Sequence, residues 1–192
     1  MTKFATIASY ILHPAVLMLA TVATYSALVR HSFIAVLIDI GILLLGLLPG
    51  LFYIFIQTKR GVFASYHLVI KEQRRVTLIL LLVGLLISFL FYRSIGVPAM
   101  MTDGMAIALI GGIIIALITW FWKISFHAAV AMGCSALFLV VSIPHMIIFF
   151  ILALLSGIVR IPVKHHTPMQ VLGGWVYGFG ITIGLLWLFN YV

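Results

Sequence analysis

The sequence contains few charged residues. Only 7% of its 192 residues are charged and 65% are hydrophobic, whereas soluble domains have about 25% charged residues. So few charges cannot cover the surface of a water-soluble fold, which excludes a soluble enzyme, a secreted disulfide scaffold and a disordered tail. We therefore expect an integral membrane protein.

Acidic residues and cysteine are also scarce. The acids are Asp39, Glu72 and Asp103, and Cys134 is the single cysteine. One cysteine excludes an internal disulfide and a cysteine metal cluster, and three scattered acids cannot form a carboxylate-rich metal cage. We therefore expect neither a metal nor a cofactor.

The basic residues give the chain a net charge of +8. They lie in short stretches between apolar runs, whereas nucleic-acid binding needs an exposed basic face with interleaved aromatic residues. We therefore expect membrane lipids, anionic headgroups or a phosphate as partners, and no nucleic acid.

Seven apolar runs are candidates for membrane-spanning helices, at residues 6–28, 32–56, 76–92, 104–122, 126–143, 146–159 and 169–192. They predict an all-α, polytopic helix bundle that forms one membrane domain over residues 1–192. Pro14 and Pro49 are expected inside helices, where neighbouring helices satisfy the freed carbonyls. The last run carries two small-xxx-small spacings, Gly174 with Gly178 and Gly180 with Gly184, which favour close packing within the bundle or a homo-oligomer face.

The basic residues are distributed unevenly over the two predicted sides. One side has nine Lys and Arg and the other only Arg30 and Arg93. Without Lys71, Arg74, Lys123 and Arg160, which are candidate site residues, the count is still five against two. The positive-inside rule then places the N-terminus and the site in the cytoplasm and the C-terminus outside. We expect a multi-pass protein of a prokaryotic plasma membrane.

Three clusters of basic residues and histidine are predicted at one membrane face. The first runs from His67 to Arg75 and contains Lys71 and Arg74; the second contains Lys123, Ser125 and His127; the third contains Arg160, Lys164, His165, His166 and Gln170. Each pair of intervening helices crosses the membrane and returns. Gathered cations with almost no carboxylate indicate an anion site, and two histidines beside it suit nucleophilic and acid–base roles.

This pattern resembles the type 2 phosphatidic acid phosphatase superfamily, whose three motifs are K-x6-R-P, P-S-G-H and S-R-x5-H-x3-D. Arg160 is followed after five residues by His166, and three further residues lead to Gln170. Ser125 and His127 match the second motif, in which Ile124 and Phe126 replace proline and glycine. Lys71 matches the first, with Leu78 at the arginine position and Arg74 or Arg75 as substitutes.

The resemblance covers residues 71–192 and leaves residues 1–56 as an additional N-terminal helix pair. It implies a six-helix phosphatase-like core preceded by an extra helix. It also implies a phosphatase that acts on a lipid phosphate or a prenyl diphosphate. His166 would be the nucleophile and His127 the general acid, while Lys71, Ser125 and Arg160 would hold the phosphate, with Arg74 and Lys123 as further contacts. In this mechanism cationic side chains neutralise the phosphoryl oxygens, a task that a metal ion performs in other phosphatases.

Gln170 stands where the family has the aspartate that orients the nucleophile. Glutamine accepts a hydrogen bond but supplies no charge, so we expect Gln170→Asp to raise the activity, with Gln170→Glu as the variant that tests reach. The alternative is a catalytically degenerate relative that binds an anionic lipid or serves as a subunit of a membrane complex. A transporter or channel would need several intramembrane ionisable groups, and Asp39 is the one candidate.

The remaining polar residues have simpler interpretations. Asp39 either takes part in substrate handling or makes local hydrogen bonds in the bundle. His13, His31 and His145 are interpreted as interfacial or helix-packing side chains.

Overall fold

The computed structural model describes residues 2–63, 71–164 and 166–192, with side chains from residue 7 onward and, after the first gap, from residue 75. Every regular element in these ranges is a helix, so the predicted all-α fold is confirmed. Four helices are long and apolar enough to cross a membrane: α3 (Phe33–Lys59), α4 (Lys71–Ser94) from Arg75 onward, α5 (Ala99–Phe121) and α8 (Pro168–Leu188).

The other apolar helices are shorter. They are α2 (Pro14–Arg30), α6 (Phe126–Leu137), which continues into the 3-10 turn η1 (Phe138–Val140), and α7 (Ile143–Ile158). The number of seven membrane crossings therefore stays a prediction.

The first predicted run is not one helix. It is divided into α1 (Thr2–Ile11) and α2, and His13 between them is extended at φ −66° and ψ 142°. Placing Pro14 inside a helix was wrong: proline disfavours the helical conformation of the preceding residue and suits the first position of a new helix. Pro49 does lie inside α3, as predicted.

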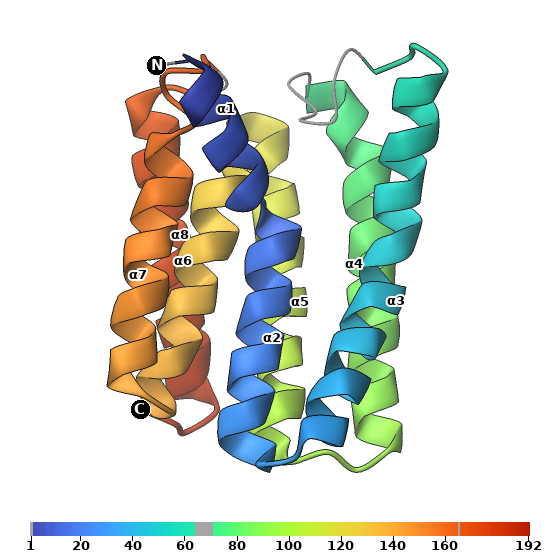
Figure 1. Ribbon diagram of the computed structural model, residues 1–192, viewed down its shortest axis with the longest axis vertical. Coiled ribbons are helices and arrows are strands. Elements are labelled where there is room, and N and C mark those ends of the chain that lie inside the picture. Colours follow the sequence, from blue (N-terminus) through green and yellow to red (C-terminus); the bar gives the residue numbers. More distant parts are fainter. Residues whose placement is uncertain (1, 64–70, 165) are drawn as a thin grey trace. The chain divides into compact units, whose positions relative to one another are not determined.

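The described chain forms two compact units. Unit 1 comprises Met1–Val36 and Ile124–Val192, and unit 2 comprises Leu37–Lys123. In unit 1, α6 packs against α8, α7 and α2, and α7 also contacts α8. Figure 1 shows α6, α7 and α8 side by side, with α1 near the end of the unit where α7 ends and α8 begins.

Small residues allow α6 and α8 to approach closely. A Cβ atom added at Gly178 would lie 2.1 Å from the carbonyl oxygen of Ala129, and one at Gly174 would lie 2.6 Å from that of Ser125. Nothing lies within 4 Å of the corresponding positions at Gly180 and Gly184. The first two glycines therefore serve helix packing within unit 1.

The apolar core of unit 1 joins its N-terminal and C-terminal segments. A cluster of buried residues combines the α1–α2 corner and α2 with α6 and α7: Leu12, Leu17, Ala131, Met132 and Ala153. Ser156 Oγ also donates a hydrogen bond to the carbonyl oxygen of Leu12 at 3.1 Å. The N-terminal helices are thus packed into the same unit as the last three.

Unit 2 is held together by close contact of α3 with α4 and by packing of α4 against α5. A Cβ atom at Gly84 would lie 1.7 Å from the carbonyl oxygen of Gly46, and Ser88 Oγ donates to the carbonyl oxygen of Ile42 at 3.2 Å. Asp39 is fully buried in α3, and both interpretations of this residue stay open.

Candidate functional site

Five of the predicted site residues belong to unit 1: Ser125, His127, Arg160, His166 and Gln170. The other three, Lys71, Arg74 and Lys123, belong to unit 2. The side chains of Lys71 and Arg74 lie outside the described residues, as does all of His67. The participation of these three cations stays a prediction. The described geometry of the site is that of unit 1.

Two helix starts and one helix end bring the five residues together. Ser125 is the N-cap of α6 and His127 is the second residue of that helix, while Arg160 and His166 lie in the connection from α7 to α8. The start of α6, the end of α7 and the start of α8 lie toward the same end of the unit (Figure 1). Ser125 and His127 of the second cluster thus lie toward the same end of unit 1 as Arg160 and His166 of the third.

A backbone hydrogen bond joins the two clusters directly. The N–H of Ser125 donates to the carbonyl oxygen of Gln170 at 3.0 Å. The close approach at Gly174, one turn further along α8, holds the two helix starts against each other. The start of α6, which carries His127, is therefore held against the start of α8, to which His166 is bonded through Gln170.

The imidazole of His166 is held by Gln170. His166 Nδ1 lies 3.2 Å from Gln170 Oε1, which also accepts the backbone N–H of Thr167 at 3.1 Å. Because a backbone N–H can only donate, the atom it meets must be the amide oxygen, and His166 Nδ1 must then donate as well. The proton is thereby placed on Nδ1, and Nε2 of a neutral ring keeps its lone pair.

Gln170 also belongs to the N-terminal cap of α8. Thr167 Oγ1 accepts the N–H of Gln170 at 3.3 Å while the Gln170 side chain accepts the N–H of Thr167, which completes a capping box. Serine or threonine followed three residues later by glutamate or glutamine is the sequence pattern of this motif. Thr167 and this role of Gln170 were missed, although the sequence Thr167-Pro-Met-Gln170 contains the signal.

Arg160 is buried, with 1% of its surface exposed. Its Nη1 donates a hydrogen bond to Ser9 Oγ of α1, and its carbonyl oxygen accepts the N–H of His166 at 3.4 Å. The turn between them passes through Lys164 in the left-handed region at φ 56°. Ser9 is itself 1% exposed, and nothing in the sequence motifs pointed to it.

His127 is 8% exposed and lies beside a second histidine that we had interpreted as interfacial or packing. The ring of His13 meets the ring of His127 edge to face, with centroids 5.3 Å apart and an interplanar angle of 86°. His13 comes directly before α2, so the break at Pro14 is what directs this side chain toward α6.

The charged and dipolar groups of the site in unit 1 all favour a negatively charged ligand. None of the three acidic residues of the sequence belongs to unit 1. The buried guanidinium of Arg160 and the N-terminal ends of α6 and α8 all favour negative charge. The arrangement can therefore bind an anion and offers it imidazole groups for covalent and proton-transfer chemistry.

Over the described residues, no group of three or more His, Cys, Asp or Glu side chains is arranged to hold a metal ion. Comparisons of the chain with protein-family models, with curated proteins and with solved structures found no match.

Proposed function

We propose that this protein is a membrane-embedded phosphatase that removes phosphate from a lipid phosphate or an isoprenoid diphosphate. The observation that carries the proposal is the buried Arg160, whose carbonyl oxygen accepts the N–H of His166 and whose guanidinium donates to Ser9, in a unit without acidic side chains. A phosphate group supplies the negative charge that such a site favours, and the lipid tail suits an apolar bundle. The R-x5-H spacing and the resemblance to type 2 phosphatidic acid phosphatases support the same reaction.

In this mechanism Nε2 of His166 attacks phosphorus and forms an N–P bond. The bond from phosphorus to the leaving oxygen breaks, and His127 transfers a proton to that oxygen. His127 then accepts a proton from water, whose oxygen attacks the phosphohistidine and releases inorganic phosphate. Arg160 and Ser125 stabilise the phosphoryl oxygens, and Lys71, Arg74 and Lys123 add charge if they join the site.

The hydrogen bond from His166 to Gln170 supports this assignment of roles. It leaves the lone pair on Nε2, which is the nitrogen that must attack. Gln170 thus supplies the orientation that the family's aspartate supplies, without its charge. We further propose that seven helices cross the membrane and that the site faces the cytoplasm.

Phosphate release from a panel of lipid phosphates and prenyl diphosphates, by detergent-solubilised protein with a chelator present, tests this function. We expect turnover by the wild-type protein and a loss of at least about 100-fold in His166→Ala, because general catalysis by a positioned side chain contributes roughly 10²–10⁴-fold. His145→Ala, a half-buried histidine at the other end of unit 1, should keep wild-type activity. Wild-type protein that is inert on every lipid of the panel would contradict the proposal.

The neutral amide of Gln170 favours one alternative, a relative that binds an anionic lipid without hydrolysing it. Calorimetric titration with the same lipids separates the two functions. Binding together with turnover supports the phosphatase, whereas binding without turnover supports the degenerate relative.

A further inference from the structure

The corner between α1 and α2 contacts both ends of the proposed reaction centre. Ser9 accepts a hydrogen bond from the guanidinium of Arg160, and four residues later His13 lies against the ring of His127. Ser9 is 1% exposed, so this serine is part of the interior of unit 1. The corner therefore connects the cation proposed to hold the phosphate with the histidine proposed to protonate the leaving group.

These contacts belong to one closed network of residues. His127 is joined to Ser125 by the first turn of α6, Ser125 to Gln170 by a backbone hydrogen bond, and Gln170 to His166 by a side-chain hydrogen bond. His166 is joined to Arg160 through its N–H, and Arg160 to Ser9 through its guanidinium. Ser9 and His13 belong to the same corner between α1 and α2, so the contact of His13 with His127 closes the network.

The ring of His13 is itself fixed. Its Nδ1 accepts the backbone N–H of Ala15 at 3.2 Å, which makes His13 the side-chain cap of α2. Because that nitrogen accepts, the proton of a neutral His13 ring is on Nε2. The His13 ring is held by its hydrogen bond from Ala15, so it is a rigid surface against which the ring of His127 packs.

We propose that Ser9 and His13 are positioning residues of the site, Ser9 for the guanidinium of Arg160 and His13 for the imidazole of His127. This inference rests on the proposed phosphatase function. Histidine transfers a proton efficiently only when its ring is held within hydrogen-bond reach of the reacting oxygen. His13 limits the orientations of His127, and Ser9 limits those of the guanidinium that receives the phosphate.

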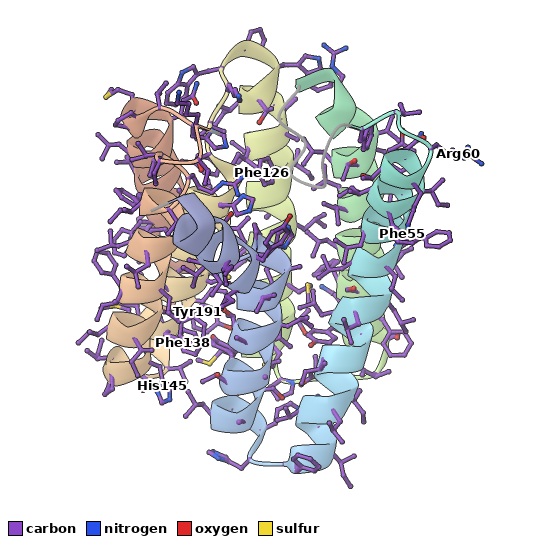
Figure 2. All side chains as sticks on the ribbon, turned by 45° about the horizontal axis from the view of Figure 1, so that its top comes forward. Phe55, Arg60, Phe126, Phe138, His145 and Tyr191 are labelled. Carbon is purple, nitrogen blue, oxygen red and sulfur yellow. The ribbon has the colours of Figure 1, made fainter. Side chains whose placement is uncertain are left out.

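The substitution His13→Asn separates positioning from helix capping. Asparagine is a strong N-cap residue, so the start of α2 is kept while the imidazole is removed. The matched control is His145→Asn, because His145 lies near the start of α7, is half-buried like His13 and contacts Phe138 with ring centroids 5.9 Å apart. Figure 2 shows Phe138 and His145 near one end of unit 1, away from Phe126 at the start of α6.

With a lipid phosphate that the wild-type protein hydrolyses, His13→Asn should lower kcat by about tenfold, because a misoriented acid loses part of its roughly 10²–10⁴-fold contribution. KM should change by less than about threefold, since phosphate contacts are kept. His145→Asn should match the wild type in both constants. Unchanged kcat in His13→Asn overturns the role of His13 and leaves the phosphatase function standing, whereas inert wild-type protein overturns both.

Ser9→Ala tests the second contact. It should raise KM by roughly three- to tenfold with a smaller effect on kcat, because the phosphate-binding guanidinium loses a partner. The control is Ser156→Ala, which removes a hydrogen bond from the same corner to the carbonyl oxygen of Leu12 but leaves Ser9 in place. Equal effects of the two substitutions on KM would show that loosening the corner is sufficient, and would overturn the role of Ser9.

Discussion

At the scale of single residues, Gln170 combines two roles on one oxygen atom. Oε1 accepts both the N–H of Thr167, which caps α8, and Nδ1 of His166, which sets the tautomer of the proposed nucleophile. A side chain at this position therefore needs an acceptor at the reach of a glutamine. This requirement favours glutamate over the aspartate that the resemblance to type 2 phosphatidic acid phosphatases suggested for this position.

Gln170→Glu should raise phosphatase activity by about tenfold, a barrier lower by about 1.4 kcal/mol. Glutamate keeps the capping box and adds a negative charge that stabilises the imidazolium-like ring as phosphate leaves. The new carboxylate would be the only acidic side chain of unit 1. Steady-state rates on the preferred lipid phosphate measure the gain.

Gln170→Asp separates charge from reach, since aspartate is one methylene shorter. We expect a smaller gain than with glutamate, because the shorter side chain cannot serve both Thr167 and His166 as glutamine does. Neither carboxylate should have any effect in a His166→Ala background, which has no ring to orient. A larger gain with aspartate than with glutamate would contradict the geometry of the capping box.

At the scale of helices, the contact between α6 and α8 determines where both halves of the site lie. Gly174 and Gly178 face α6, whereas Gly180 has open space around its position. Ala129 and Ser125 present backbone oxygens at this contact, so a side chain at Gly178 meets atoms that cannot rotate away.

Gly178→Ala should destabilise the protein, because its Cβ would lie 2.1 Å from the oxygen of Ala129 and the two helices must separate. Gly180→Ala is the matched control and should leave stability unchanged or raise it by up to about 1 kcal/mol, since alanine is the better helix former. Thermal unfolding in detergent compares the two variants. Equal unfolding temperatures would contradict the close packing.

The sequence predicts most helices well but not the break at Pro14. The run from residue 6 to residue 28 has the length of one crossing, and proline is tolerated inside membrane helices, as it is at Pro49. The position before Pro14 becomes a cap because the His13 ring accepts the N–H of Ala15. Both a continued helix and a new helix start are compatible with proline, so the local pattern alone does not decide between them; the His13 ring also contacts His127 of α6, a partner that the local pattern does not contain.

At the scale of the whole molecule, the orientation of the chain decides which membrane face contains the site. The connection from α7 to α8 and the end of α8 lie at opposite ends of unit 1 (Figure 1). A reporter fused after Val192 therefore samples the face opposite the site. With the site in the cytoplasm, as the excess of Lys and Arg predicts, an alkaline phosphatase fusion in bacterial cells should be active. An inactive, well-expressed fusion would place the site outside.

Long-range contacts explain what the sequence could not predict about the site. R-x5-H and the spacing from Ser125 to His127 are local, so they can be recognised in the sequence. Ser9 and His13 reach the same site through contacts with residues more than 100 positions away, and no spacing rule connects them. The sequence motifs set residues 1–56 apart as an N-terminal helix pair. In the structure α1 and α2 belong to unit 1, together with Arg160 and His127, whereas most of α3 belongs to unit 2.

This arrangement has a consequence for the order of synthesis. The hydrogen bond from Arg160 to Ser9 spans 151 residues, and all of unit 2 is encoded between the two parts of unit 1. At roughly 5–20 residues per second, Ser9 is synthesised about 8–30 seconds before Arg160. The residues of α1 and α2 are therefore synthesised well before their partners in α6 and in the connection from α7 to α8, and the contact between Ser9 and Arg160 forms only late in translation.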